Sequence, residues 1–251
     1  AQASGDLRQI QETNTSRPQF SVPEDVLARR WGIGLETARK TIQVTTQRGV
    51  KHVVHPVNRR FRTRRAELKF PVSNQKLYSD TAFFTIPSVR MHTCAQIFTD
   101  TEGWDHFYPM KSKGEAGDAL KALIDETRWI PRTIVTDGAL EQQAGHWETM
   151  RKKHGIQQRW TEPYSPWQNR AEDSVREIKK AIKRHTLQRN SPKRLWCYLG
   201  EWVAAVRRLT YRESLTSHFQ VPAARYQNGY SDISEYAMFD WYEYVWYLNP
   251  N

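Results

Sequence analysis

The fold is decided by the stretch KLYSDTAFFTI, residues 76–86. Its aromatic and β-branched residues predict a strand, and Asp80 lies inside that strand. Two further strands are predicted after it, over 94–99 and 104–109, with turn-forming residues between them. The three strands together predict the first half of a sheet.

Helices and strands alternate in the residues that follow. The predicted elements are an amphipathic helix over 115–127, a strand over 133–136, a polar helix over 142–154, a strand over 157–160, a turn over 163–166, a basic helix over 170–187 and a last helix over 192–211. This succession predicts an α/β fold, a mixed sheet with helices on its faces.

Three carboxylates stand where such a sheet presents functional groups. Asp80 lies in the first strand, Asp137 directly follows the fourth, and Glu172 lies at the start of the basic helix. Sites in open α/β sheets lie beyond the carboxyl ends of the parallel strands, so adjacent first and fourth strands would bring the two aspartates together. Three such oxygen donors suit Mg²⁺ or Mn²⁺, and two ions about 4 Å apart can activate a hydroxyl and stabilise the leaving oxygen of a phosphodiester. The pattern predicts catalytic and metal-binding roles for all three residues.

Chance is the alternative, because 27 acidic residues will supply some spacing of this kind. The rival carboxylates are Asp100, Asp105, Asp118 and Asp125. Asp100 is expected at a hairpin tip, where turn chemistry accounts for an aspartate, and Asp118 and Asp125 are expected on a solvated helix face. Spacing alone leaves the two interpretations open.

The composition favours a polyanionic partner. Lys and Arg number 38 against 27 acidic residues, a formal net charge of +11, and nucleic acid is the commonest polyanion that a basic protein meets. Arg176 and Lys179 follow Glu172 by four and seven residues on one helical face, and Lys183 extends the row. This row predicts double-stranded DNA binding beside the carboxylates; the alternative is the solvated side of an ordinary amphipathic helix. No stretch approaches the roughly 18 apolar residues of a membrane span, so a membrane is not a predicted partner.

Two short helices around a glycine turn are predicted over 21–50, in the outline of a helix-turn-helix. Arg39 and Lys40 would lie on its polar face and bind DNA. An ordinary helical hairpin packed on the main domain is the alternative. The segment after it contains a dense arginine cluster, expected either to bind phosphate or to form a solvated linker. The cluster consists of Arg59, Arg60, Arg62, Arg64 and Arg65.

The predicted domain organisation has five parts. They are a flexible lead-in over 1–20, the helix-turn-helix-like module over 21–50, a basic linker over 51–75, a catalytic core over 76–215 and a C-terminal extension over 216–251. The aromatic residues of 230–247 are expected to form the core of a small β module, with base stacking or a partner interface as alternatives. An N-terminal Ala and an end directly after that aromatic run indicate a fragment of a longer polyprotein.

Three runs of the chain carry a family resemblance. They are YSD at 78–80, VTDG at 135–138 and PYSPWQNRAE at 163–172. Together they resemble the catalytic core of the integrases of copia-type retrotransposons, over roughly 77–248. Three features depart from that pattern: His52 and His55 lack the cysteine pair of the family's N-terminal zinc module, and Gly138 and Ala139 replace the usual Asn and Gly. The stretch from Asn169 to Glu172 is also one residue shorter than usual, so the adjacent Asp173 is an alternative to Glu172.

The resemblance implies a ribonuclease H-like fold in which Asp80, Asp137 and Glu172 hold two Mg²⁺ or Mn²⁺ ions. It implies a polynucleotidyl transferase that trims the 3′ ends of element DNA and joins them to target DNA, as a homo-oligomer. The expected location is intracellular, in the nucleus or in a cytoplasmic virus-like particle. Two other functions stay open: a non-catalytic DNA-binding protein derived from an integrase, and a related transposase or nuclease.

Overall fold

The structure is a computed structural model that describes residues 21–47, 76–137, 145–162, 169–213, 215, 220–226 and 231–244. Several predicted features lie outside these residues. They are the lead-in over 1–20, the cluster of Arg59, Arg60, Arg62, Arg64 and Arg65, and the turn over 163–166. No helix of the described part is long and apolar enough to cross a membrane.

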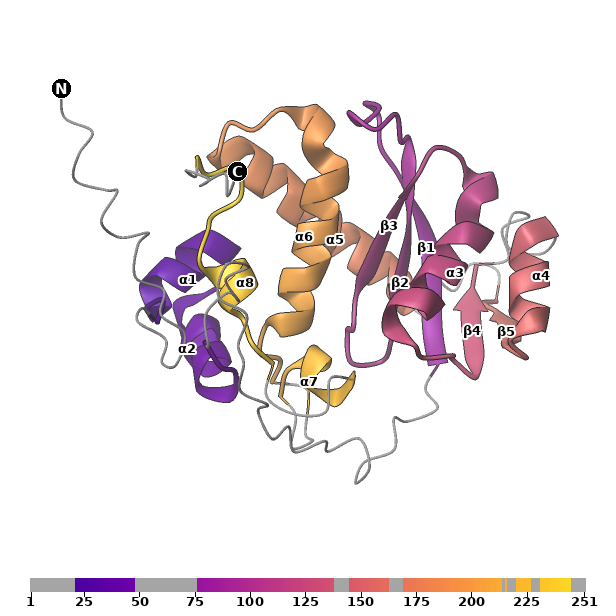
Figure 1. Cartoon of the computed structure of the whole chain (residues 1–251), viewed down its shortest axis with the longest axis horizontal. Coiled ribbons are helices and arrows are strands. Elements are labelled where there is room, and N and C mark those ends of the chain that lie inside the picture. Colours follow the sequence, from indigo (N-terminus) through magenta and orange to yellow (C-terminus); the bar gives the residue numbers. More distant parts are fainter. Residues whose placement is uncertain are drawn as a thin grey trace, which may run out of the picture.

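A five-stranded mixed sheet forms the centre of the molecule (Figure 1). Its strands are β1 (Lys76–Phe83), β2 (Cys94–Thr99), β3 (His106–Met110), β4 (Thr133–Thr136) and β5 (Gln157–Trp160), in the order β3-β2-β1-β4-β5. β1 pairs with β2, and β2 with β3, in antiparallel fashion, whereas β1, β4 and β5 are parallel neighbours. This order and these directions are those of a ribonuclease H-like sheet. The predicted fold class is confirmed.

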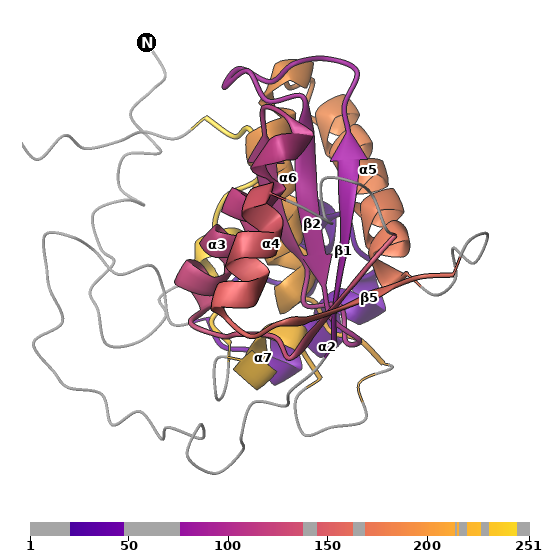
Figure 2. The same cartoon turned by 90° about the vertical axis from the view of Figure 1, so that its right-hand side faces the viewer.

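Helices cover both faces of the sheet (Figures 1 and 2). One face packs against α3 (Ala116–Thr127) and α4 (Gly145–Lys153), and the other against α5 (Arg170–Gln188) and α6 (Trp196–Leu209). Successive strand residues point to opposite faces, so in β1 Leu77 enters the core under α3 while Ala82 enters the core under α5. Asp80 has the same parity as Ala82 and therefore lies on the α5 side.

Two predicted element boundaries were wrong by a few residues, for local reasons. The first strand ends at Phe83 rather than Ile86, because the chain turns around Ser88, whose Oγ accepts hydrogen bonds from two backbone N–H groups. The third strand begins at His106 rather than residue 104, because the Trp104 backbone N–H donates to Asp100 Oδ1 at 2.9 Å within the preceding turn. A 3₁₀ turn, η6 (Lys193–Leu195), directly precedes α6. Another 3₁₀ turn, η3 (Lys113–Glu115), directly precedes α3.

The two ends of the chain share a third core with α6. Helices α1 (Glu24–Trp31), α2 (Leu35–Val44), α7 (Pro222–Tyr226) and α8 (Ser234–Ala237) surround Val206 and Leu209 of α6. Trp31 is buried, and its indole N–H donates to the Tyr236 carbonyl at 2.9 Å. The two predicted helices at the N-terminus are present, and their turn uses Gly32 at φ 62°, a conformation that favours glycine.

The prediction of a small β module in the aromatic tail is wrong for the described residues 231–244. They contain α8 and one isolated bridge, between Asp232 and Thr46, and no strand. Ile233, Tyr236 and Ala237 pack into the helical third core, whereas Trp241 packs against the core under α5 and Tyr244 is exposed.

Candidate active site

The pairing of β1 with β4 places two of the three predicted carboxylates side by side. Tyr78 is the partner of Val135 in the parallel ladder. Asp80 lies two residues after Tyr78, and Asp137 lies two residues after Val135. The two aspartates therefore stand level on neighbouring strands, at the carboxyl end of β4. Asp80 is half-buried, and Asp137 is exposed directly after the last residue of β4.

Asn169 attaches the start of α5 to the strand that carries Asp80. Its side-chain Oδ1 accepts a hydrogen bond from the Ala171 backbone N–H at 3.0 Å, which caps the helix. Its Nδ2 donates to the Ser79 carbonyl oxygen at 3.4 Å, and the side chain is buried. Glu172 lies in the first turn of α5, so this double attachment holds the glutamate near Asp80.

The electrostatics of Asp80 link all three carboxylates. The pKa of Asp80 is raised to about 6, chiefly by burial and also by the negative charges of Asp137 and Glu172. The Thr81 backbone N–H, which donates to Asp80 Oδ1 at 2.7 Å, and the charge of Lys179 act in the opposite direction. The charges of Asp137, Glu172 and Lys179 thus all affect the ionisation of Asp80.

These carboxylates do not close into a coordination sphere. Within the described residues, no group of three or more His, Cys, Asp or Glu side chains is arranged to hold a metal ion. Burial is the main cause of the raised pKa of Asp80, and the mutual repulsion of the three carboxylates adds to it. The donors are all oxygen atoms, which is the chemistry of Mg²⁺ and Mn²⁺ sites, so the residues fit such ions by type.

The basic row on α5 is only partly directed at this site. Lys179 influences Asp80, and its Nζ lies 5.7 Å from the centre of the Phe84 ring. Arg176 instead pairs with Asp173, with 2.6 Å between Nη2 and Oδ1, and Lys183 is exposed further along the helix. Of the three predicted cations, Lys179 is the one that the structure brings to the carboxylates.

The cations predicted on the helix-turn-helix have partners within the chain. Arg39 makes two 2.9 Å hydrogen bonds to the carboxylate of Glu24. Lys40 lies 3.8 Å from Glu36 and 5.3 Å from the centre of the Tyr211 ring. The polar face of α2 therefore carries balanced charge in this structure.

Asp105, one of the rival carboxylates, has a structural position that sequence reasoning did not identify. It is completely buried, and its Oδ1 accepts a hydrogen bond from Ser174 Oγ on α5 at 2.8 Å. Its Oδ2 lies 2.7 Å from Arg207 Nε and 3.2 Å from Arg212 Nη2. Despite its burial, the two guanidinium groups hold the pKa of Asp105 below its usual value. The residue joins β3 to α5 and α6.

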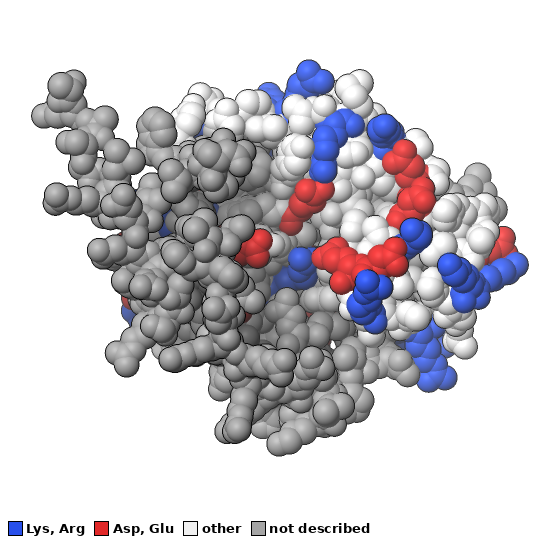
Figure 3. Space-filling view, in the orientation of Figure 1, with Lys and Arg blue, Asp and Glu red and all other residues white. Residues whose placement is uncertain are grey.

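The other rival carboxylates have the local roles expected of them. Asp100 Oδ1 accepts backbone hydrogen bonds from Glu102 and Trp104 in the turn before β3. Asp118 and Asp125 are exposed on α3, where Asp125 pairs with Lys121. Figure 3 shows acidic and basic side chains interspersed among the described residues on the face of the molecule that it presents.

Comparisons with known proteins leave the family open. No family model matches the chain, and no curated protein matches it. One similar structure is a chain of the simian T-cell lymphotropic virus intasome in complex with PP2A regulatory subunit B56 gamma, at 16% identity and a TM-score of 0.49, with 62% of this chain and 55% of that chain covered. Another is the HTLV-2 integrase catalytic core domain in complex with magnesium, at 15% identity and a TM-score of 0.46, with 63% of this chain and 97% of that chain covered. The chain thus spans little more than half the length of the intasome chain. The fold assignment depends on the order and directions of the strands.

Proposed function

We propose that the protein is the integrase of a copia-type retrotransposon, a polynucleotidyl transferase that processes the 3′ ends of element DNA and joins them to target DNA. The observation that carries the proposal is that Asp80 interacts electrostatically with both Asp137 and Glu172 at the carboxyl end of β4. A ribonuclease H-like sheet serves many functions, so the argument depends on these side chains rather than on the fold.

Asp80 and Asp137 would hold divalent ions from the sheet, and Glu172 would complete the ligand set from α5. Bound Mg²⁺ or Mn²⁺ supplies Lewis acidity and a lowered pKa for the attacking hydroxyl. Asp80 has to be ionised to act as a ligand, and the positive charge of Lys179 favours that form. Lys179 would also attract the phosphodiester, since it stands beside the carboxylates on α5.

The expected partners are the ends of the element DNA and the target duplex, and the expected assembly is a homo-oligomer that brings two DNA ends to one target. We expect it to act inside the cell, in the nucleus or in a virus-like particle.

Replacing Asp137 with Asn tests the catalytic assignment. A pool of blunt DNA duplexes with randomised terminal base pairs, a supercoiled plasmid and Mg²⁺ form the assay, and joined products are amplified and counted. The substitution should reduce joining by at least about 100-fold, because a lost carboxylate ligand removes several kcal/mol of charge stabilisation. Asp173→Asn is the matched control, since Asp173 is exposed and pairs with Arg176. Joining by Asp137→Asn at the wild-type level would refute the assignment.

The same assay separates the competing functions. A non-catalytic DNA-binding protein would bind the duplex without joining it, and chelation of divalent ions would leave binding unchanged. A nuclease would nick the plasmid in a metal-dependent reaction without capturing the duplex ends.

A further inference from the structure

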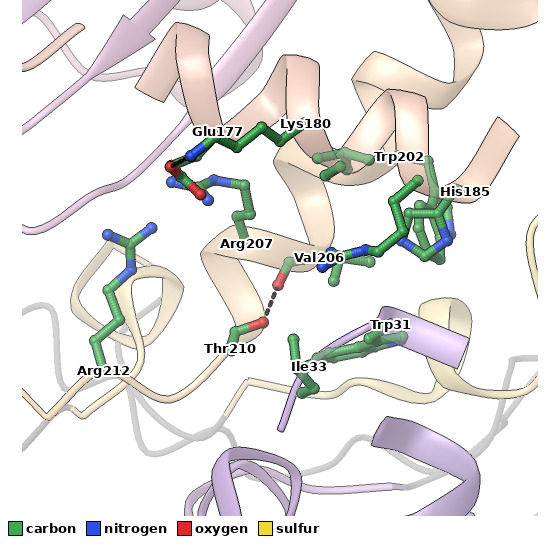
Figure 4. Close-up of a pocket in the computed structure, with 13 residues that line it drawn as sticks. Trp31, Ile33, Glu177, Lys180, His185, Trp202, Val206, Arg207, Thr210 and Arg212 are labelled. Atoms are coloured by element: carbon green, nitrogen blue, oxygen red, sulfur yellow. Dashed lines mark hydrogen bonds and ion pairs between the residues drawn. The ribbon is translucent and has the colours of Figure 1, made fainter. Parts of the chain in front are cut away.

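A cleft separates α5 and α6 from the turn between α1 and α2 (Figure 4). Its volume is about 370 Å³. Trp31 and Ile33 close one side, and four basic residues line the cleft from the core: Lys180, Arg184, Arg207 and Arg212. We call it the cationic cleft. It faces the N-terminal hairpin rather than the carboxylates.

Two guanidinium groups of the cleft are held in place from behind by Asp105. Arg207 uses Nε and Arg212 uses one Nη to contact the same carboxylate oxygen. Each guanidinium carries five N–H donors in a planar fork that matches an oxyanion such as phosphate. The side chains of Arg207 and Arg212 are 24% and 28% exposed, and that of Asp105 is fully buried. The aspartate thus fixes both cations: Arg207 stays partly exposed in the cleft, whereas Nη1 of Arg212 packs against Gly103.

The cleft carries excess positive charge. Lys180 pairs with Glu177 at 3.0 Å, and Asp105 serves both Arg207 and Arg212. The charge of Asp100 also acts on Arg212, so four cations against these three carboxylates leave one net positive charge.

Two further residues complete the charge of this site. Arg184 packs against Gly32, where an added Cβ would lie 2.9 Å from its Nε, and it forms no ion pair with any residue that the structure describes. His185 adds no charge at neutral pH, because burial lowers its pKa to about 4. The cleft is therefore suited to an anion.

The helix α5 connects this cleft to the carboxylates. Glu172 and Arg184 are 12 residues apart on α5, which corresponds to about 18 Å at a rise of 1.5 Å per residue. Lys180 and Arg184 lie about 80° to 120° around the helix from Glu172. A DNA strand that leaves the carboxylates and crosses α5 obliquely would meet the cleft.

We propose that the cationic cleft binds a backbone phosphate of DNA about 18 Å along α5 from the reacting phosphodiester. The core and the N-terminal hairpin then hold the same duplex, with Gly32 giving the Arg184 guanidinium room at the edge of the cleft. The distance to the reacting phosphodiester rests on the proposed function, whereas the binding of a phosphate by the cleft does not.

Charge reversal at Arg184 tests this site. Fluorescence anisotropy of a blunt-ended DNA duplex, in chelator and over a range of salt concentrations, measures binding without catalysis. Arg184→Glu should weaken binding by about tenfold and reduce the slope of log affinity against log salt by about 0.9, the loss of one phosphate contact. Lys193→Glu changes the charge equally at an exposed residue outside the cleft and should keep the wild-type slope. Arg184→Gln, which keeps the stem, should show the same direction of change.

The other possible results distinguish failure of the cleft proposal from failure of the proposed function. Slopes that are equal for the wild type and both Arg184 variants would overturn the cleft while leaving the proposed function intact if joining persists. Wild-type binding that depends on Arg184, without any joining, would refute the integrase function and support the cleft. Inorganic pyrophosphate binding that needs Arg184, alongside DNA binding that does not, would assign the cleft to a small anion and overturn the proposal.

Discussion

His185 should make the stability of the protein fall as the pH falls from about 6.5 to about 4. Its side chain is buried on α5, its ring centre lies 5.1 Å from that of Trp202, and it has a hydrogen bond to the Trp31 backbone. Its pKa is lowered from 6.5 to about 4, chiefly by burial and also by the charge of Arg184, against the opposite effect of the Trp31 hydrogen bond.

The direction of this pH dependence follows from proton binding by the folded and unfolded states. In the unfolded chain the imidazole takes up a proton near pH 6.5, whereas in the folded protein it does so only near pH 4. Its contribution to stability is present above pH 6.5 and is lost as the pH falls through that interval. At about 1.36 kcal/mol per pH unit, the full loss is about 3 kcal/mol, and the loss between about pH 7 and pH 5 is about 2 kcal/mol.

Other groups affect the stability in the same pH range, so the contribution of His185 has to be measured as the difference between the wild type and a His185 variant. The raised pKa of Asp80 has the opposite effect, because its contribution is present below pH 3.8 and is lost as the pH rises through about 6. The pKa of the buried His106 is lowered like that of His185. Subtracting the curve of a His185 variant from the wild-type curve removes both contributions.

The assay is urea denaturation followed by tryptophan fluorescence at about pH 7 and about pH 5. Between these values the wild type should lose about 2 kcal/mol more than His185→Gln. His154→Gln, at the end of α4, is the control and should follow the wild type. Equal losses in the wild type and His185→Gln would refute the assigned cause.

Two further predictions concern the attachment of helices to the sheet. Asn169→Ala should lower the free energy of unfolding by about 1–2 kcal/mol, because the cap of α5 and the bond to Ser79 are lost, and Asn169→Ser should recover about half, because its hydroxyl restores only the cap. Urea denaturation measures both, and equal values for the two variants would contradict the double role. Gly200→Ala should cost about 1–3 kcal/mol in the same assay, because its Cβ would lie 2.4 Å from the Phe107 ring. Gly114→Ala, whose Cβ would lie 3.6 Å from Ser112 Oγ, is its control, and equal stability of the two would contradict this packing.

Local patterns predicted most of the fold because each strand and helix follows from its own residues. The alternation of β1, the β-branched β4 and the amphipathic α3 are all visible within short windows. The neighbouring positions of Asp80 and Asp137 followed from a rule about parallel strands, and the register of β1 and β4 agrees with it. These predictions needed no knowledge of which side chains meet.

Partners distant in the sequence could not be predicted in this way. Asp105 precedes its partners Arg207 and Arg212 by about a hundred residues, and Asn169 follows the Ser79 carbonyl by 90. Nothing in the local pattern around Asp105 distinguishes it from a surface aspartate. Such contacts depend on how α5 and α6 cross the sheet, and this is decided by the packing of the whole core.

The N-terminal hairpin shows how packing changes a functional inference. Its sequence indicates that α2 reads DNA through Arg39 and Lys40, but in the structure these cations face Glu24 and Glu36, so that surface is close to neutral. Exposed pairs of this kind are weak, and a phosphate could compete for them. Long-range attraction nevertheless depends on net charge, and in the described residues it is the cleft beside the α1–α2 turn, rather than α2 itself, that keeps a net positive charge. The hairpin would then contribute to DNA binding mainly by forming a wall of that cleft.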